Sequence, residues 1–309
     1  MPKLYIDEFV GISNRLETLP LAFAIRMAYG HDIILDWREL DSFRVDETRR
    51  GKVRILARLG AERVRTCDAV KFATLRDKKI ILRSLNGPSE ILDPIYMEVA
   101  RKIHLNANLA DNIRETFASV KDRPVIGVHI RHGDFIVVDE NRYDVKGAEW
   151  PAVPIWWYEK AMAAIVKREK DASFFLSCTG DSAFYASLHR NFDVFALKIR
   201  SHYGYKEAST HKSTVNPVAD LFALACCPVL LATPISGYSH WAANVLGRPA
   251  TCIVPLPGAT PDEPAMGKLQ VHGQRLPVWR AAGRAGTAEP LSATLDGVDL
   301  NQGADTNWL

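Results

Sequence analysis

The sequence lacks the cysteine pattern of a disulfide-stapled protein. Its 309 residues contain five cysteines at irregular spacing, two of them adjacent: Cys67, Cys178, Cys226, Cys227 and Cys252. An odd number cannot pair completely, and no C-x-x-C offers the spacing of a zinc site. We therefore expect free thiols in a reducing compartment, which predicts a cytoplasmic protein.

Long apolar runs and a strong charge excess are also lacking. The most apolar region, residues 215–235, is interrupted by Asp220 and by Pro217, Pro228 and Pro234. A membrane span needs about 20 mostly apolar residues, so we expect a buried helix followed by a buried strand instead. The net charge of +3 is too small for a general nucleic-acid binder, although a local basic pocket for a phosphorylated ligand remains compatible with it.

Several signatures of nucleotide and acyl chemistry are missing as well. No strand is followed by G-x-G-x-x-G, no G-x-x-x-x-G-K-[ST] occurs, and there is no G-x-S-x-G. These absences argue against a dinucleotide fingerprint, a P-loop and a serine nucleophile elbow. No D-x-D stands in a loop to hold a divalent cation, so we expect no metal site.

What the sequence does contain is alternation of strands and helices. Apolar strands are predicted at residues 4–6, 31–37, 78–84, 124–130, 172–178, 193–197, 228–233 and 250–254, and helices at residues 19–30, 49–60, 91–103, 109–120, 155–169, 182–190, 218–227 and 237–247. Apolar strands separated by helices indicate an α/β fold with parallel sheets covered on both faces.

We divide the chain into three parts. Residues 1–122 form an N-terminal α/β domain, and residues 123–256 form a doubly wound, nucleotide-type domain. Residues 257–309 are rich in Gly, Ala, Thr and Asp with weak periodicity. We expect this extension to be extended or poorly ordered, tied down near Trp308.

The sharpest motif, GVHIRHGDF at residues 127–135, begins in a predicted strand and continues past its carboxyl end. Ligands of open α/β sheets bind at such ends, so His129, Arg131, His132 and Asp134 are expected to gather at a crevice. Arg131 suits forked binding of phosphate oxygens, and Asp134 could hold a neighbouring cation in place. The alternative is a strand end with solvated charges.

A second motif combines Asp220 with the helix start ISGYSHW. Ser236, Gly237 and Ser239 would lie where free backbone N–H groups and a positive helix end favour a diphosphate. The alternative is ordinary N-capping by Ser236.

Two weaker motifs also follow predicted strands. Asn14 and Arg15 lie after the first strand, and Asp181 lies in SCTGDS after the strand at residues 172–178. Asp181 could contact a ribose hydroxyl or cap the next helix. Asn14 and Arg15 are candidates for donor binding, although turn formation or capping is the commoner explanation of such a loop.

Taken in order, GISNRL with DWREL, GVHIRHGD, FFLSCTGDS and ADLFALACC…PISGYSHW resemble the α1,6-fucosyltransferase superfamily, most of all the bacterial nodulation-factor (NodZ-type) fucosyltransferases. HIRHGD is similar to the H-x-R-[RH] motif of α1,2-, α1,6- and protein-O-fucosyltransferases. The resemblance covers roughly residues 4–254.

The resemblance implies a GT-B fold, with two Rossmann-like domains facing across a cleft and the acceptor on the N-terminal side. It implies GDP-fucose as donor substrate, no cofactor, no essential metal and an inverting reaction. Arg131 would contact the donor diphosphate, His129 and Asp220 the guanine, and Ser236 with Gly237 the phosphates. His132 replaces the second Arg of the commoner motif, and Asp139 and Glu140 are the candidates for the base.

Two other functions remain open at this point. One is a transferase of the same fold that uses another nucleotide sugar, since no motif defines the sugar pocket. The other is a nucleotide-sugar-binding protein without catalysis, which is favoured if the loop of Asp139 and Glu140 points away from the site. The acceptor, expected to be a glycan hydroxyl, is not identified by the sequence.

Overall fold

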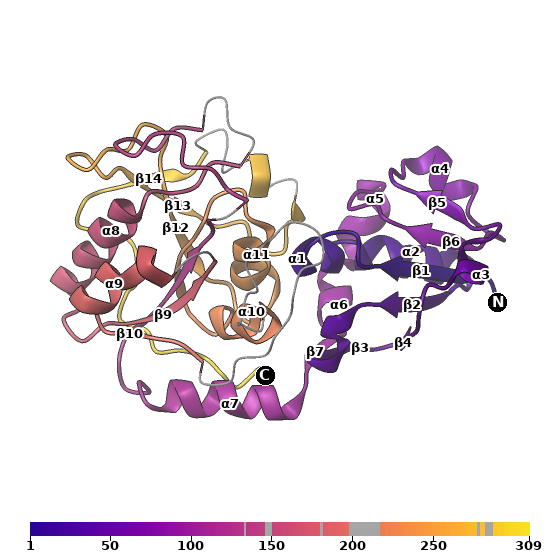
Figure 1. Cartoon of the computed structure of the whole chain (residues 1–309), viewed down its shortest axis with the longest axis horizontal. Coiled ribbons are helices and arrows are strands. Elements are labelled where there is room, and N and C mark those ends of the chain that lie inside the picture. The colour runs from indigo at the N-terminus through magenta and orange to yellow at the C-terminus, as the bar shows by residue number, and fades with distance from the viewer. Residues whose placement is uncertain (133, 146–149, 180–181, 198–216, 277–278, 282–286) are drawn as a thin grey trace. The chain divides into compact units, whose positions relative to one another are not determined.

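The computed structural model describes residues 1–309 except 133, 146–149, 180–181, 198–216, 277–278 and 282–286. The chain forms two compact units (Figure 1). Unit 1 comprises Met1–Asn106 and Gly273–Arg275, and unit 2 comprises Ala107–His272 and Leu276–Leu309.

The boundary between the units lies before helix α7 (Ala107–Ala118), earlier than the predicted boundary at residue 122. The reason is packing. Phe117 of α7 lies against Phe175 and Phe195, with ring centroids 5.4 and 5.3 Å apart. The buried face of α7 therefore belongs to the core of unit 2.

Unit 1 is built on a parallel five-stranded sheet in the order β4-β2-β1-β6-β5. Its strands are β1 Lys3–Asp7, β2 Asp32–Asp36, β4 Thr48–Arg50, β5 Glu62–Val64 and β6 Ile80–Leu82, and a separate antiparallel pair joins β3 Phe43–Val45 to β7 Ile103–Leu105. Its helices are α1 Ile12–Leu16, α2 Leu19–Tyr29, η1 Arg38–Asp41, α3 Ile55–Arg58, α4 Ala69–Ala73, α5 Ser89–Leu92, η2 Asp93–Ile95 and α6 Tyr96–Ala100.

The helix at residues 19–30 was correctly predicted, whereas the one at residues 49–60 was too long. Helix α2 ends at Gly30, whose φ of 75° is the left-handed cap that glycine adopts without strain. Arg49 and Arg50 instead pair with β2 as the edge strand β4, which leaves only α3 helical.

Unit 2 contains a seven-stranded sheet in the order β10-β9-β8-β11-β12-β13-β14. The strands are β8 Val125–Ile130, β9 Ser173–Cys178, β10 Val194–Phe195, β11 Val229–Leu231, β12 Thr251–Pro255, β13 Met266–Leu269 and β14 Glu289–Leu291. The helices besides α7 are α8 Ile155–Arg168, η3 Ser182–Tyr185, α9 Ala186–Asn191, α10 Pro217–Leu224, α11 Gly237–His240 and the π-helical turn η4 Trp241–Val245. Helices α8 and α9 lie on one side of the sheet, and α10 and α11 lie on the other (Figure 1).

Strand β8 is the central element of unit 2, and its residues alternate between the two faces. Val128 and Ile130 share a buried cluster with Trp157 of α8. On the opposite face, a Cβ at Gly127 would lie 3.1 Å from the side chain of Cys227, so any larger residue would push on the chain that follows α10. His129, two residues on, faces the same side as Gly127.

The C-terminal extension differs from its prediction, because it completes the core of unit 2. Strands β13 and β14 add antiparallel pairs to β12. Leu295, Val298 and Leu300 are fully buried. Trp308 stacks on Phe222 with ring centroids 5.7 Å apart, so the chain is tied down near Trp308 as expected.

All five cysteines are free thiols. Within the described ranges, no helix has the length and apolar character needed to cross a membrane.

Candidate functional site

The site of unit 2 lies where the strand order of its sheet reverses. From β8 the chain adds β9 and β10 on one side, and β11 then returns to pair with the other side of β8. All these pairs are parallel, so the carboxyl ends of β8 and β11 lie together at a topological switch point, the position where open α/β sheets bind ligands. Arg131 follows β8 and Ser236 follows β11.

The Thr233 hydroxyl connects the end of β11 to the end of β8 through hydrogen bonds. It donates to the carbonyl of His129 at 2.8 Å and accepts from the backbone N–H of Arg131 at 3.1 Å. The hydroxyl of Tyr158 also donates to the His129 carbonyl at 3.1 Å. Neither Thr233 nor Tyr158 was predicted as a site residue, although Thr233 is the polar residue at the end of the predicted strand 228–233.

His129 is held as a neutral imidazole inside the site. Its Nδ1 lies 2.7 Å from the hydroxyl of Ser239, and its ring stacks on Tyr238 with centroids 4.9 Å apart. Burial, together with the positive charge of Arg131, lowers the pKa of His129 to about 3. At neutral pH the ring can therefore donate or accept a hydrogen bond without carrying charge.

Asp220 lies close enough to Tyr238 for its charge to act on the Tyr238 hydroxyl. It is buried on α10 with only 7% of its surface exposed. Burial, followed by the negative charge of Asp220, raises the pKa of the Tyr238 hydroxyl, which donates to the carbonyl of Pro217. The Tyr238 ring thus stands between His129 and the segment that carries Asp220, a role for which no sequence signal existed.

The turn that leads into α11 is strained and leaves a hydroxyl unpaired. Ile235 has a φ of 67°, which a β-branched residue rarely adopts. The Oγ of Ser236 is buried and has no hydrogen-bond partner in the described part of the chain, and Ser236 does not cap α11 through its side chain. Buried polar atoms are almost always paired and a β-branched residue rarely has a positive φ, so this hydroxyl and this turn are two departures from ordinary packing in one place. The N-capping alternative does not describe this serine.

Arg131 lies beside this turn as a partly exposed cation. Its Nε and Nη2 donate to the two carboxylate oxygens of Asp134 at 3.0 and 2.6 Å, and its guanidinium lies 4.9 Å from the centre of the Phe135 ring. Nη1 has no partner among the described residues. Asp134 thus orients Arg131, as the sequence suggested, while leaving hydrogen-bond donors for an anion.

His132 is anchored at the end of β8 by polar contacts. Its Nε2 lies 3.1 Å from the carbonyl of Val153, and its backbone N–H donates to the hydroxyl of Thr179 at 3.0 Å. The ring also stacks on Tyr185 with centroids 6.0 Å apart. These contacts fix the end of β8. Asp181, the neighbouring candidate, lies outside the described residues.

Asp139 and Glu140 are both exposed on the loop after Phe135. Asp139 accepts a hydrogen bond from the backbone N–H of Asn141 at 2.9 Å, and the carbonyl of Glu140 accepts from Trp156 Nε1 at 2.9 Å. Within the described part of the chain, no contact joins either carboxylate to Arg131.

The two candidates in unit 1, Asn14 and Arg15, lie on the short helix α1. Arg15 is 1% exposed, and its guanidinium forms a forked pair with Glu39 at 3.0 and 2.5 Å. Its Nε also donates to the carbonyl of Val10 at 2.9 Å, and the group lies over the ring of Trp37. The structure thus uses Arg15 to fix the loop after β1 and presents no free cation at this position.

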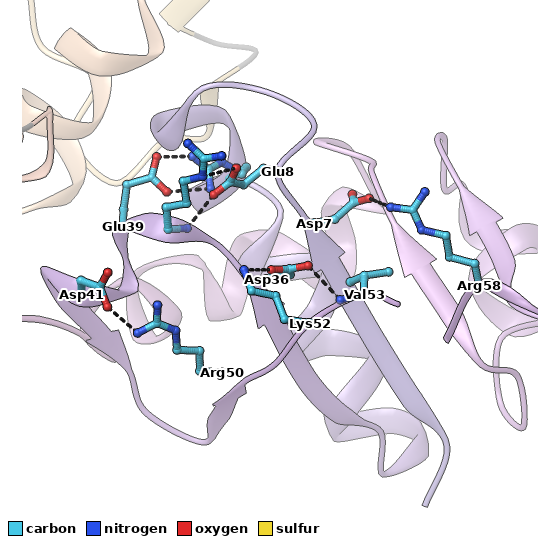
Figure 2. Close-up of polar contacts among 11 residues, drawn as sticks. Asp7, Glu8, Asp36, Glu39, Asp41, Arg50, Lys52, Val53 and Arg58 are labelled. Atoms are coloured by element: carbon cyan, nitrogen blue, oxygen red, sulfur yellow. Dashed lines mark hydrogen bonds and ion pairs between the residues drawn. The ribbon is translucent and has the colours of Figure 1, made fainter. Parts of the chain in front are cut away.

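Unit 1 has a switch point of its own, between β1 and β6. Arg83 donates from Nε and Nη2 to the two oxygens of Asp7 at 2.9 and 2.5 Å. Figure 2 shows Asp7 also facing Arg58, and Asp36 bonded to Lys52 and to the backbone N–H of Val53. A hollow of about 80 Å³ lies here, lined by Asp7, Arg58, Arg63, Ile81 and Arg83.

No group of three His, Cys, Asp or Glu side chains that could hold a metal ion occurs among the residues the structure describes. No family model matches the chain. No curated protein matches it either.

Solved structures, in contrast, share its fold at low sequence identity. A NodZ alpha-1,6-fucosyltransferase soaked with GDP-fucose aligns with a TM-score of 0.54 and 16% sequence identity, over 87% of this chain and 99% of that one. Fucosyltransferase NodZ from Bradyrhizobium aligns with a TM-score of 0.50 and 14% identity, over 82% and 96%. A mutant of Arabidopsis thaliana FUT1 in complex with GDP aligns with a TM-score of 0.54 and 10% identity, over 88% and 74%. These likenesses confirm the predicted fold: the chain is an α/β protein of the GT-B class, with the fold of the NodZ-type fucosyltransferases that its motifs resemble.

Proposed function

We propose that this protein is an inverting glycosyltransferase that moves fucose from GDP-fucose to a glycan hydroxyl. The observation that carries the proposal is the switch point of unit 2, where a buried, unpaired hydroxyl on Ser236 and the cation of Arg131 follow adjacent parallel strands. Solved structures of this fold were obtained with GDP or GDP-fucose, which supports a guanosine diphosphate at this position.

In the proposed complex the diphosphate lies against Arg131, the Ser236 hydroxyl and the Gly237 N–H. Asp220 and the neutral His129 recognise the guanine. An ionised carboxylate only accepts hydrogen bonds, which suits the adjacent N1–H and N2–H groups of a guanine better than the single N3–H of a uracil, which lies between two carbonyl oxygens. Specificity for GDP would then follow from one buried acid.

The chemistry follows from the charge that develops on the leaving group. As the sugar becomes oxocarbenium-like, negative charge builds on GDP, and Arg131 with the turn at Ser236 stabilises that charge more in the transition state than in the ground state. A carboxylate takes the proton of the acceptor hydroxyl, and we retain Asp139 and Glu140 as the candidates for this base. With a fixed cation in this place, we propose that the reaction needs no metal ion.

Donor hydrolysis tests this function against simple nucleotide binding. A transferase releases GDP slowly from GDP-fucose when water replaces the acceptor, whereas a binding protein releases none. We expect GDP release that persists in EDTA and that falls in Asp139→Asn or in Glu140→Gln. Binding of GDP-fucose without any GDP release would contradict catalysis, and faster release from a UDP-sugar would contradict the donor.

A further inference from the structure

Helix α3 of unit 1 presents its large apolar side chains outward. Ile55, Leu56 and Leu59 are 78%, 79% and 61% exposed. The small Ala57 instead packs inward, against a cluster on the sheet that includes Ile81. A surface helix normally buries its large apolar residues, so the packing of unit 1 does not account for these three side chains.

The same segment is strongly basic. Residues 49–65 contain seven Lys or Arg and one acidic residue, so this stretch alone carries +6 while the whole chain carries +3. Lys52 and Arg58 face Asp36 and Asp7 (Figure 2). Arg54 and Arg63 are exposed and have no ion-pair partner in the part of the chain that the structure describes.

The exposed apolar side chains and the basic residues lie next to one another. Arg54 directly precedes the exposed Ile55, and Arg63 shares the hollow at the carboxyl end of β1 with Arg58 of α3. We call Arg54, Ile55, Leu56, Leu59 and Arg63 the α3 surface. It offers aliphatic side chains flanked by guanidinium groups that form no ion pair with any residue the structure describes.

We propose that the α3 surface docks onto an anionic lipid bilayer. Ile55, Leu56 and Leu59 would enter the boundary between headgroups and acyl chains, while Arg54 and Arg63 bind lipid phosphates. A bilayer meets both requirements at once, because interfacial segments combine buried apolar area with attraction to anionic lipids. The inference does not depend on the proposed function, since the α3 surface shares no residue with the donor site.

Co-sedimentation with vesicles tests the inference. We expect the whole protein to sediment with phosphatidylcholine vesicles that contain 30% phosphatidylglycerol, at least tenfold more strongly than with phosphatidylcholine alone. Binding should weaken in high salt, which screens the arginines. The variant Ile55→Ser/Leu56→Ser/Leu59→Ser should lose at least tenfold in partitioning.

A matched control removes exposed apolar side chains elsewhere in unit 1. Met27 and Val70 are 66% and 77% exposed, so Met27→Ser/Val70→Ser should bind vesicles like the wild type. Circular dichroism melting should show both variants folded, because the changed side chains are exposed. Equal losses in both variants, no preference for anionic vesicles, or binding unchanged in the triple variant would overturn the proposal. Equally tight binding of wild type and triple variant to soluble polyglutamate, without vesicle binding, would assign the surface to acidic proteins instead.

Discussion

The Nδ1 of His129 lies 2.7 Å from the hydroxyl of Ser239, which also accepts a hydrogen bond from the backbone N–H of Thr233. This one hydroxyl joins β8, the turn after β11 and the start of α11. Ser236, three residues earlier, has a buried hydroxyl with no hydrogen-bond partner among the residues that the structure describes. The two serines therefore differ: the Ser239 hydroxyl holds the fold, and we propose that the Ser236 hydroxyl binds the donor.

Substituting these serines separately should give opposite results. Ser236→Ala removes an unpaired buried hydroxyl, so stability should stay within about 0.5 kcal/mol of wild type. GDP affinity should fall about tenfold or more, because a hydrogen bond to a charged group contributes roughly 1.5–3 kcal/mol. Urea unfolding and calorimetric titration with GDP measure the two effects.

Ser239→Ala serves as the comparison. It leaves the Thr233 N–H and the His129 Nδ1 without their partner, which should cost roughly 1–3 kcal/mol of stability. A Ser236→Ala variant that is as destabilised as Ser239→Ala, with unchanged GDP affinity, would make Ser236 a structural residue.

His129 should make stability depend on pH. Burial lowers the pKa of His129 to about 3 in the fold, below the ordinary value of 6.5, so the unfolded chain binds the proton first. Its contribution is fully present above pH 6.5 and is lost as the pH falls toward 3. Between pH 6 and pH 5 the free energy of unfolding should drop by about 1 kcal/mol from this residue.

The variant His129→Gln isolates that contribution in urea titrations at pH 7, 6 and 5. In this variant the free energy of unfolding should fall by about 1 kcal/mol less between pH 6 and pH 5 than it does in the wild type. His240→Gln should behave in the same way, because burial, followed by the positive charge of Arg280, lowers the pKa of His240 to about 3. An unchanged slope in both variants would show that these rings are not buried as neutral groups.

Arg131 should matter to turnover more than to folding. Its side chain is 32% exposed and pairs with an exposed Asp134, so Arg131→Ala should change stability little. If the guanidinium stabilises charge on the leaving GDP, kcat should fall roughly a hundredfold to a thousandfold, more than KM rises. Arg131→Lys should restore only part of kcat, because an ammonium cannot form the forked contact.

His132→Ala is the control for this substitution. Since its ring contacts the Val153 carbonyl, its loss should reduce turnover less than the loss of Arg131. Turnover near wild type in Arg131→Ala, or unfolding of that variant, would make the motif at the end of β8 a structural one.

The sequence predicted unit 2 better than unit 1 for a physical reason. Strands β8 and β11 are buried on both faces and read as continuous apolar runs, which is how parallel strands are recognised. The edge strands β4 and β5 are three residues long and contain Arg and Glu, so nothing in their local pattern distinguishes them from loops.

The sequence predicted the positions of those site residues that lie at or just after the end of a single apolar strand. His129, Arg131 and Ser236 each follow or end a buried strand, so their positions could be inferred locally. Tyr238 could not be assigned, because its stacking depends on how α11 packs against β8. Arg15 was predicted as a donor-binding candidate. Its ion pair with Glu39 could not be foreseen, because Glu39 lies 24 positions away in the sequence.

We therefore expect the Arg15–Glu39 pair to contribute to the stability of unit 1. Both side chains are buried, so Glu39→Gln leaves the guanidinium without its countercharge, which should cost about 3–5 kcal/mol of stability. Arg15→Met/Glu39→Met should be less destabilising than either single loss, because no charge remains buried. Chemical denaturation of the three proteins checks this, and a Glu39→Gln variant as stable as the wild type would contradict it.

Calorimetric titration of the wild-type protein with GDP and with UDP tests the central claim most directly. The switch point of unit 2, with Asp220 beside Tyr238 and with Ser236 unpaired, predicts one GDP per chain and binding of UDP at least tenfold weaker. GDP at 100 times its dissociation constant should then stabilise the fold by about 2.7 kcal/mol. Equal binding of UDP would contradict the assignment of guanine to Asp220, and no binding of either nucleotide would contradict the donor site itself.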